Sequence, residues 1–106
     1  AIESAAGLGR LLHGEAVAIG LVLALRFSAF LRFAPIADAE RLAAHLGEVG
    51  LPTRLDQVGL RGGALMQWID QDKKNAPGAL TLVLAHGIGR AFVLPAADRA
   101  ALVEFL

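Results

Sequence analysis

The chain has 106 residues, the length of a single compact domain. Ten Lys and Arg residues balance ten Asp and Glu residues, so the formal net charge is zero, which argues against a basic nucleic-acid-binding surface. The absence of cysteine excludes a disulfide framework and a thiolate zinc site. The hydrophobic fraction of 56% exceeds the roughly 45–50% of typical domains, which predicts apolar surface that packs against another domain or subunit.

The N-terminal third is predicted to be helical. Residues 1–6 are expected to be the last turns of a helix whose start is absent, with Gly7 as its C-terminal stop. A domain that begins inside a helix is interpreted as a cut domain. A long helix is predicted for about residues 11–33, ended by Pro35. Small residues four apart on one face of this helix would let another backbone approach closely: Ala16, Gly20 and Ala24.

The longest apolar run lies inside that helix, from Ala16 to Leu25. It is about half of the roughly 20 residues that a membrane span needs, and charged residues flank it, so we interpret it as a buried core helix. The N-terminus has no basic segment followed by a short apolar core, so no signal peptide is expected. We therefore expect no contact with a membrane.

A second helix is predicted for about residues 39–49. Asp38 is its expected N-cap, and Gly50 followed by Pro52 would end it. Spacing along the helix predicts an inner face formed by three residues: Leu42, Leu46 and Val49.

The remaining elements are shorter. A loop with one short turn is expected at residues 53–63, followed by a helix at 64–74 and a break at 75–78. A β-hairpin is expected at residues 80–94, with strands at 80–85 and 90–94, and a final helix at 95–106. The predicted fold class is therefore mainly α, with a short hairpin near the C-terminus.

The first candidate site residue is His13, which begins the most apolar helix and precedes Gly14 and Glu15. A neutral imidazole is a common zinc ligand, and the glycine beside it would let a ligand come close. The alternative is a hydrogen-bonded core histidine. No other His or carboxylate stands at a ligand-like spacing from His13.

The second candidate is the run Asp72-Lys73-Lys74. If the inner stripe of the helix is Leu65, Trp68 and Ile69, then Asp72 continues this stripe, Lys73 lies at its edge and Lys74 falls on the opposite face. A lysine ammonium suits a phosphate or carboxylate, and Asp72 would orient it. The alternative is a solvated last turn, where lysines also favour the helix dipole.

The other two histidines are predicted to lie at the surface. His86 falls in the hairpin turn and His45 on the second helix, and neither is assigned a role.

Four stretches together resemble the 3-dehydroquinate synthase family of the shikimate pathway. They follow the family's order and spacing and cover most of this chain, but only the C-terminal third of a normal subunit. The stretches are AIESAAGLGRLLHGEAVAIGLVLALR at 1–26, GLPTRL at 50–55, DQDKKNAPGALTLVL at 70–84 and GIGRA at 87–91.

The resemblance implies that residues 1–106 are the metal- and substrate-binding helical C-terminal domain of a larger subunit. It implies conversion of 3-deoxy-D-arabino-heptulosonate 7-phosphate to 3-dehydroquinate and phosphate, with NAD+ taking and returning a hydride and a zinc ion held by one Glu and two His. His13 would be one zinc ligand. Lys73 or Lys74 would contact the anionic end of the substrate, and the helical stripe favours Lys73.

The chain also departs from the family pattern. An HTxGH-like motif, the zinc-binding Glu, a second substrate lysine, a substrate arginine and the N-terminal NAD-binding domain all lack a counterpart here. Leu21 replaces a usual Met, a conservative change. We therefore expect the isolated chain to be inactive and to hold neither cofactor tightly. The expected partners are the NAD-binding domain, a small phosphorylated sugar acid and a second subunit in a cytoplasmic homodimer.

Three alternatives remain. A related sugar-phosphate cyclase and an iron- or zinc-dependent alcohol dehydrogenase share the two-domain plan, although the DKKN segment and the strands after it argue against the dehydrogenase. A non-catalytic helical interaction module would also suit the high apolar content. The sequence upstream of Ala1 distinguishes the enzyme from such a module, because an NAD-binding half ending in an HTxGH-like motif is expected only for the enzyme.

Overall fold

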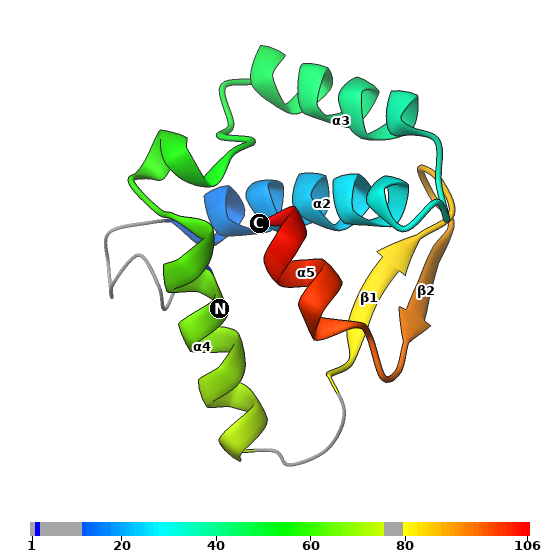
Figure 1. Cartoon of the computed structure of the whole chain (residues 1–106). Coiled ribbons are helices and arrows are strands. Elements are labelled where there is room, and N and C mark those ends of the chain that lie inside the picture. The colour runs from blue at the N-terminus through cyan, green and yellow to red at the C-terminus, as the bar shows by residue number, and fades with distance from the viewer. Residues whose placement is uncertain (1, 3–11, 76–79) are drawn as a thin grey trace.

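The computed structural model describes residue 2 and residues 12–75 and 80–106, and these are mainly helical (Figure 1). Within those ranges there are four α-helices and one antiparallel hairpin, which confirms the predicted fold class. The predicted helix at 1–6 and its stop at Gly7 lie outside the described residues, apart from residue 2. The elements are α2 (His13–Phe30), α3 (Ile36–Glu48), the 3-10 helix η1 (Leu55–Val58), α4 (Gly62–Asn75), β1 (Leu82–Ala85), β2 (Ala91–Leu94) and α5 (Arg99–Phe105).

The long helix α2 is shorter than predicted. At its start the Glu15 carboxylate accepts a hydrogen bond of 2.9 Å from the backbone N–H of Leu12. At its end Arg32 adopts a left-handed conformation with φ of 66°, and the N–H of Phe33 reaches back to the carbonyl of Ser28 at 2.8 Å. This closing turn stops α2 at Phe30. Pro35 therefore does not terminate α2 as predicted. It is the residue that precedes α3.

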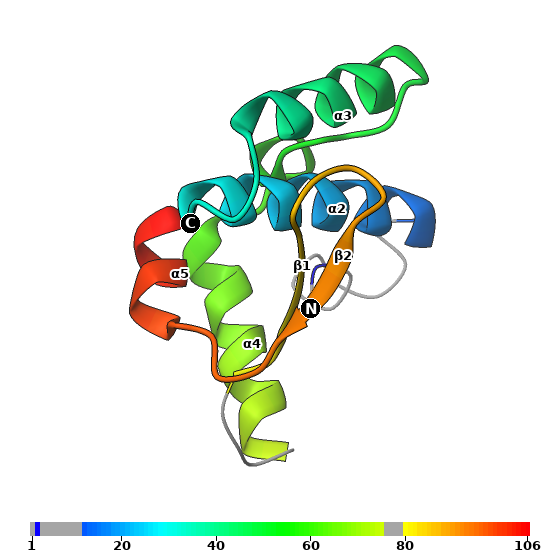
Figure 2. The same cartoon turned by 90° about the vertical axis from the view of Figure 1, so that its right-hand side faces the viewer.

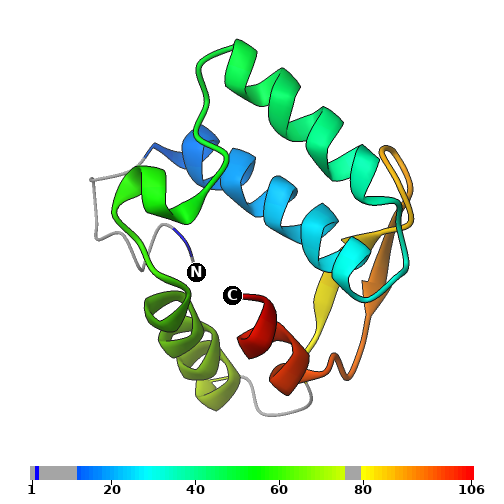
Figure 3. The ribbon, with the colours of Figure 1, turned by 45° about the horizontal axis from the view of Figure 1, so that its top comes forward.

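The position of α2 explains its apolar composition. Ile19 and Val22 on this helix are fully buried, and α2 contacts α3, β1 and α5. Figure 3 shows it running between α3 on one side and α4 with α5 on the other. By length and composition alone α2 is also apolar enough to cross a membrane, a test that a buried core helix passes as well.

A core cluster joins four elements. Phe27 of α2, Met66 of α4, Leu84 of β1 and Leu102 of α5 are all buried in it. Burying a side chain of this size stabilises the fold by about 1.5–3 kcal/mol. These four side chains therefore hold together segments that are up to 75 residues apart in sequence (102 minus 27).

A buried serine connects α2 to the hairpin. The Ser28 side chain has no exposed surface, and its hydroxyl donates to the carbonyl of Ala24 at 2.6 Å. The same oxygen accepts from the backbone N–H of Ala85 at 3.0 Å. Figure 2 shows the hairpin lying beside α2, as this bond requires. The sequence analysis did not single out Ser28.

The helix α3 begins three residues before its predicted start. Pro35 is its N-cap, so the prediction that Asp38 caps it is wrong. Instead the Asp38 carboxylate accepts a hydrogen bond of 3.2 Å from the N–H of Ile88 in the hairpin turn. Gly50, with φ of 86°, follows the end of α3 as predicted.

The inner face of α3 also differs from the prediction. Ala39 is fully buried, and Leu42 and Leu46 are half-buried, but Val49 is 61% exposed. Val49 is the C-cap residue, where the chain already turns away from the helix axis. The helical period therefore no longer determines where its side chain points.

The buried stripe of α4 is rotated from the predicted one. Leu65 and Met66 are buried and Ile69 packs against the core, whereas Trp68 is 42% exposed, so its placement on the inner stripe is wrong. Position 73 lies four residues after Ile69 and so shares the face of that residue. The backbone of α4 extends through Asn75, one residue beyond the prediction.

The hairpin and the last helix complete the fold. β1 and β2 pair antiparallel with Ala85 opposite Ala91, as the two β-like runs predict. The final helix starts four residues later than expected, at Arg99. Asp98 is the N-cap that sets this start, because its carboxylate accepts a hydrogen bond from the N–H of Ala101 at 3.2 Å.

Candidate functional site

His13 is the first residue of α2, and its side chain is exposed. It lies at one end of a pocket of about 580 Å³ that we call the α2 groove, bounded by α2, α4, α5 and β1 and lined mainly by apolar side chains. Three small residues of α2 are among those that line it: Ala16, Gly20 and Ala24. The structure therefore places the candidate metal ligand at the rim of an apolar groove, outside the core.

The described residues supply only part of a metal site. Among the side chains that the structure describes, in residues 12–71 and 80–106, no group of three His, Cys, Asp or Glu converges. Glu15, the nearest carboxylate in sequence, is bonded to the backbone N–H of Leu12 at the start of α2. A catalytic zinc usually has three protein ligands, so the described residues do not complete such a site around His13.

The two candidate lysines lie in the last turn of α4, and their side chains are outside the described structure. An ion pair fixes the helix one turn earlier. Arg99 of α5 donates from Nε to one Asp70 oxygen at 2.9 Å and from its terminal nitrogen to the other. This hydrogen bond, together with the carboxylate charge, raises the pKa of Arg99 above its ordinary value. A two-point contact of this kind holds α4 in a defined orientation on α5.

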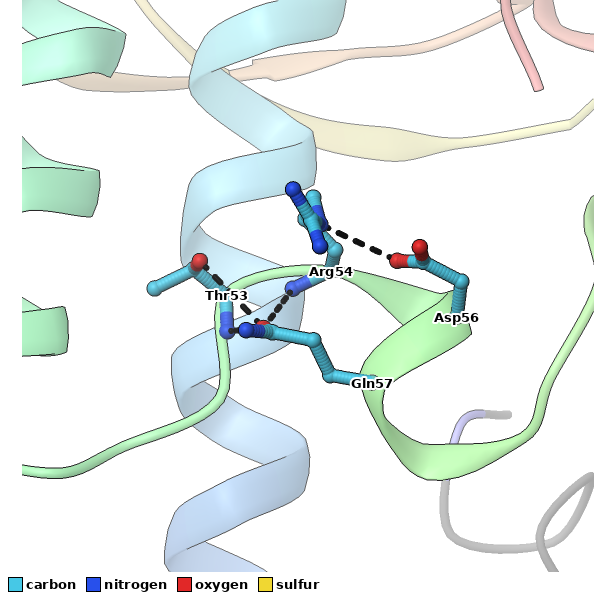
Figure 4. A network of polar contacts seen from close by, with 4 residues as sticks. All are labelled: Thr53, Arg54, Asp56 and Gln57. Atoms are coloured by element: carbon cyan, nitrogen blue, oxygen red, sulfur yellow. Dashed lines mark hydrogen bonds and ion pairs between the residues drawn. The ribbon is translucent and has the colours of Figure 1, made fainter.

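The GLPTRL loop is closed by one glutamine (Figure 4). Gln57 Oε1 accepts from the backbone N–H groups of Thr53 at 2.8 Å and Arg54 at 3.0 Å. Arg54 Nε also pairs with Asp56 Oδ1 at 3.1 Å. These bonds satisfy donors that would otherwise be open at the start of η1. The signal in the sequence was a glutamine three residues after the cap position, which the sequence analysis did not use.

The other two histidines were assigned no role from the sequence. His86 is exposed, as predicted, and its ring stacks on Phe92 with centroids 4.2 Å apart. His45 is exposed on α3, also as predicted. Next to His86, Gly87 is buried, and a Cβ atom there would lie 2.7 Å from Asp38 Oδ2. A side chain at this position would therefore require the Asp38 carboxylate, which bonds the N–H of Ile88, to move.

The described residues form a mainly helical domain with one short antiparallel hairpin. The family model described as 3-dehydroquinate synthase C-terminal matches residues 1–75, so the chain belongs to this family. This confirms the resemblance found in the sequence.

Proteins named 3-dehydroquinate synthase from several Brucella species are similar to this chain. The 3-dehydroquinate synthases of Brucella ovis, Brucella melitensis biotype 1 and Brucella abortus strain 2308 are each 51% identical to this chain over 113 aligned positions. The alignments cover all of this chain and 29% of each relative. The chain thus spans less than a third of the length of these relatives.

Proposed function

We propose that this chain is the C-terminal part of a 3-dehydroquinate synthase subunit. The subunit converts 3-deoxy-D-arabino-heptulosonate 7-phosphate to 3-dehydroquinate and phosphate, a step of aromatic amino acid biosynthesis in the cytoplasm. The observation that carries the proposal is the 51% identity to synthases over the full length of this chain. The NAD-binding half of the subunit, and a second subunit in a homodimer, are its proposed partners.

His13 is the proposed metal ligand. A zinc ion bound there, with a Glu and a second His from the rest of the subunit, would polarise the substrate hydroxyl that loses a hydride, and NAD+ would accept that hydride. The exposure of His13 at the rim of the α2 groove supports this role, because a ligand shared between segments must be accessible to both. The position at the first turn of α2 also fixes the backbone that carries the imidazole.

Lys73 is the proposed anion contact, with Lys74 as the alternative. Position 73 shares the face of α4 that carries Ile69, and the Arg99–Asp70 pair restrains this part of the helix. A lysine held on a restrained helix loses less side-chain freedom when it binds the substrate.

The test is turnover by the intact subunit that contains this chain. We expect phosphate release from 3-deoxy-D-arabino-heptulosonate 7-phosphate in the presence of NAD+, its loss on chelation and its recovery when zinc is added back. Omitting the substrate provides the background rate. If the intact subunit releases no phosphate with NAD+ and zinc supplied, the proposed function is wrong.

A further inference from the structure

A second pocket is bounded by α2, η1, the start of α4 and the end of α5, and we call it the arginine pocket. Its volume of about 510 Å³ lies within the roughly 300–1,000 Å³ of sites that hold small molecules. Three arginines line it, each from a different segment: Arg26 of α2, Arg54 just before η1 and Arg61 just before α4. The fold therefore brings positive charges from three separate segments to one pocket.

Two of these arginines are oriented by carboxylates. Arg26 Nε lies 3.4 Å from Glu40 Oε1, and Arg54 Nε lies 3.1 Å from Asp56 Oδ1 (Figure 4). Within the part of the chain that the structure describes, no terminal nitrogen of either guanidinium group donates a hydrogen bond. The carboxylates thus restrain both side chains and leave donors for a further acceptor.

Arg61 adds a third positive charge. Its side chain is exposed and makes no hydrogen bond or ion pair with any described residue. The three arginines and the two carboxylates, Glu40 and Asp56, therefore leave one positive charge uncompensated around the pocket. A concave surface with an excess of one sign of charge concentrates ions of the opposite sign. Guanidinium groups bind carboxylates and phosphates through two parallel hydrogen bonds, so these are the anions that the pocket suits.

The other wall of the arginine pocket is apolar. Leu60 in this wall is buried, and Leu23, Leu55 and Phe105 are half-buried. An inorganic ion would leave the half-buried side chains in contact with water. An anion that carries an apolar group would cover them, and removal of apolar surface from water favours binding.

We propose that the arginine pocket binds a small organic anion, a carboxylate or phosphate monoester attached to an apolar body. Arg54 and Arg61 bind the charged group, and the apolar body lies against Leu55 and Phe105. His13 does not line this pocket, so the proposal goes beyond the proposed function and does not rest on it.

The experiment titrates the intact subunit with phenyl phosphate and follows assigned methyl signals by NMR. Leu55 lines only the arginine pocket, whereas Val83 lines only the α2 groove and reports binding elsewhere. We expect the Leu55 methyl shifts to saturate in the millimolar range of phenyl phosphate. Inorganic phosphate lacks the apolar body and phenol lacks the charge, so each should bind at this pocket at least about tenfold more weakly.

Arg61→Gln removes one charge without breaking a bond to any described residue. Arg41→Gln is the matched control, because Arg41 is exposed on α3 and does not line the pocket. We expect Arg61→Gln to raise the Kd of phenyl phosphate, read from the Leu55 methyls, about tenfold or more, and Arg41→Gln to leave it almost unchanged. Arg61→Lys keeps the charge but loses the planar guanidinium, so its Kd should lie between those of wild type and Arg61→Gln.

Two results would overturn the proposal. Leu55 methyl signals that do not move with phenyl phosphate would mean that the pocket takes no such anion, including the case in which another segment of the subunit fills it. Equal Kd values for Arg61→Gln and Arg41→Gln would mean that the arginines do not hold the anion. Turnover of the sugar-acid substrate is measured separately, so either result contradicts only this pocket and leaves the proposed function standing.

Discussion

Replacing Ser28 by alanine tests how the hairpin is attached to α2. The side chain is fully buried, and its oxygen is the hydrogen-bond acceptor for the N–H of Ala85. Without it this N–H loses its partner, which costs about 1–3 kcal/mol. Alanine recovers about 0.5 kcal/mol of helix propensity. The carbonyl of Ala24 keeps its helical bond, so the net loss should be about 1–2 kcal/mol.

Urea unfolding of wild type and Ser28→Ala measures this difference. For a domain of this size a loss of about 1–2 kcal/mol corresponds to a fall in Tm of roughly 4–10 °C. Hydrogen exchange at the Ala85 amide should accelerate by the same free energy. The exposed Thr81, next to β1, gives the control Thr81→Ala, which should change little. A Ser28→Ala loss below about 0.5 kcal/mol, with the Ala85 amide still protected, would refute the reasoning.

Three further outcomes are expected. The isolated chain 1–106 should show no synthase turnover with NAD+, zinc and substrate, because catalysis needs all of these held around one reacting centre; measurable turnover would contradict this. In the intact subunit, Lys73→Ala should lower kcat/KM about ten- to a hundredfold, while Lys74→Ala changes it little; equal small effects would indicate a solvated turn. Gly87→Ala should destabilise the fold by about 1 kcal/mol, because its Cβ would lie 2.7 Å from Asp38 Oδ2 and the displaced carboxylate would lose its bond with the N–H of Ile88; in an Asp38→Ala background Gly87→Ala should cost little, and a neutral Gly87→Ala in the wild type would count against it.

The elements of the fold could be predicted because each has a local cause. The apolar run of α2, the glycine after α3 and the two β-like runs all appear where the sequence indicates. The face of each helix that is buried was harder to predict. Trp68 satisfies the helical period but is exposed, because the partners of α4 contact the adjacent face through Met66. Periodicity defines a stripe, whereas the positions of β1 and α5 decide which side of that stripe is buried.

Contacts between distant segments were not predictable. Ser28 and Ala85 are 57 residues apart, and nothing in the local pattern links a helical serine to a strand amide. Aspartate is a residue type that favours helix N-caps, but the Asp38 carboxylate accepts a hydrogen bond from the N–H of Ile88 in the hairpin turn instead. His13 could be proposed from its motif, because that motif is local. No group of three metal-ligating side chains lies among the described residues, so the metal site itself stays a prediction.

The most direct measurement is the zinc content of the intact subunit with His13 replaced by alanine. Three protein ligands hold a catalytic zinc, and removal of one should abolish tight binding. His45→Ala removes an exposed imidazole from α3 and serves as the control. We predict about one zinc per subunit in wild type and in His45→Ala, and almost none in a folded His13→Ala variant. Full zinc content in His13→Ala would contradict the assignment of this chain to the metal site of the synthase.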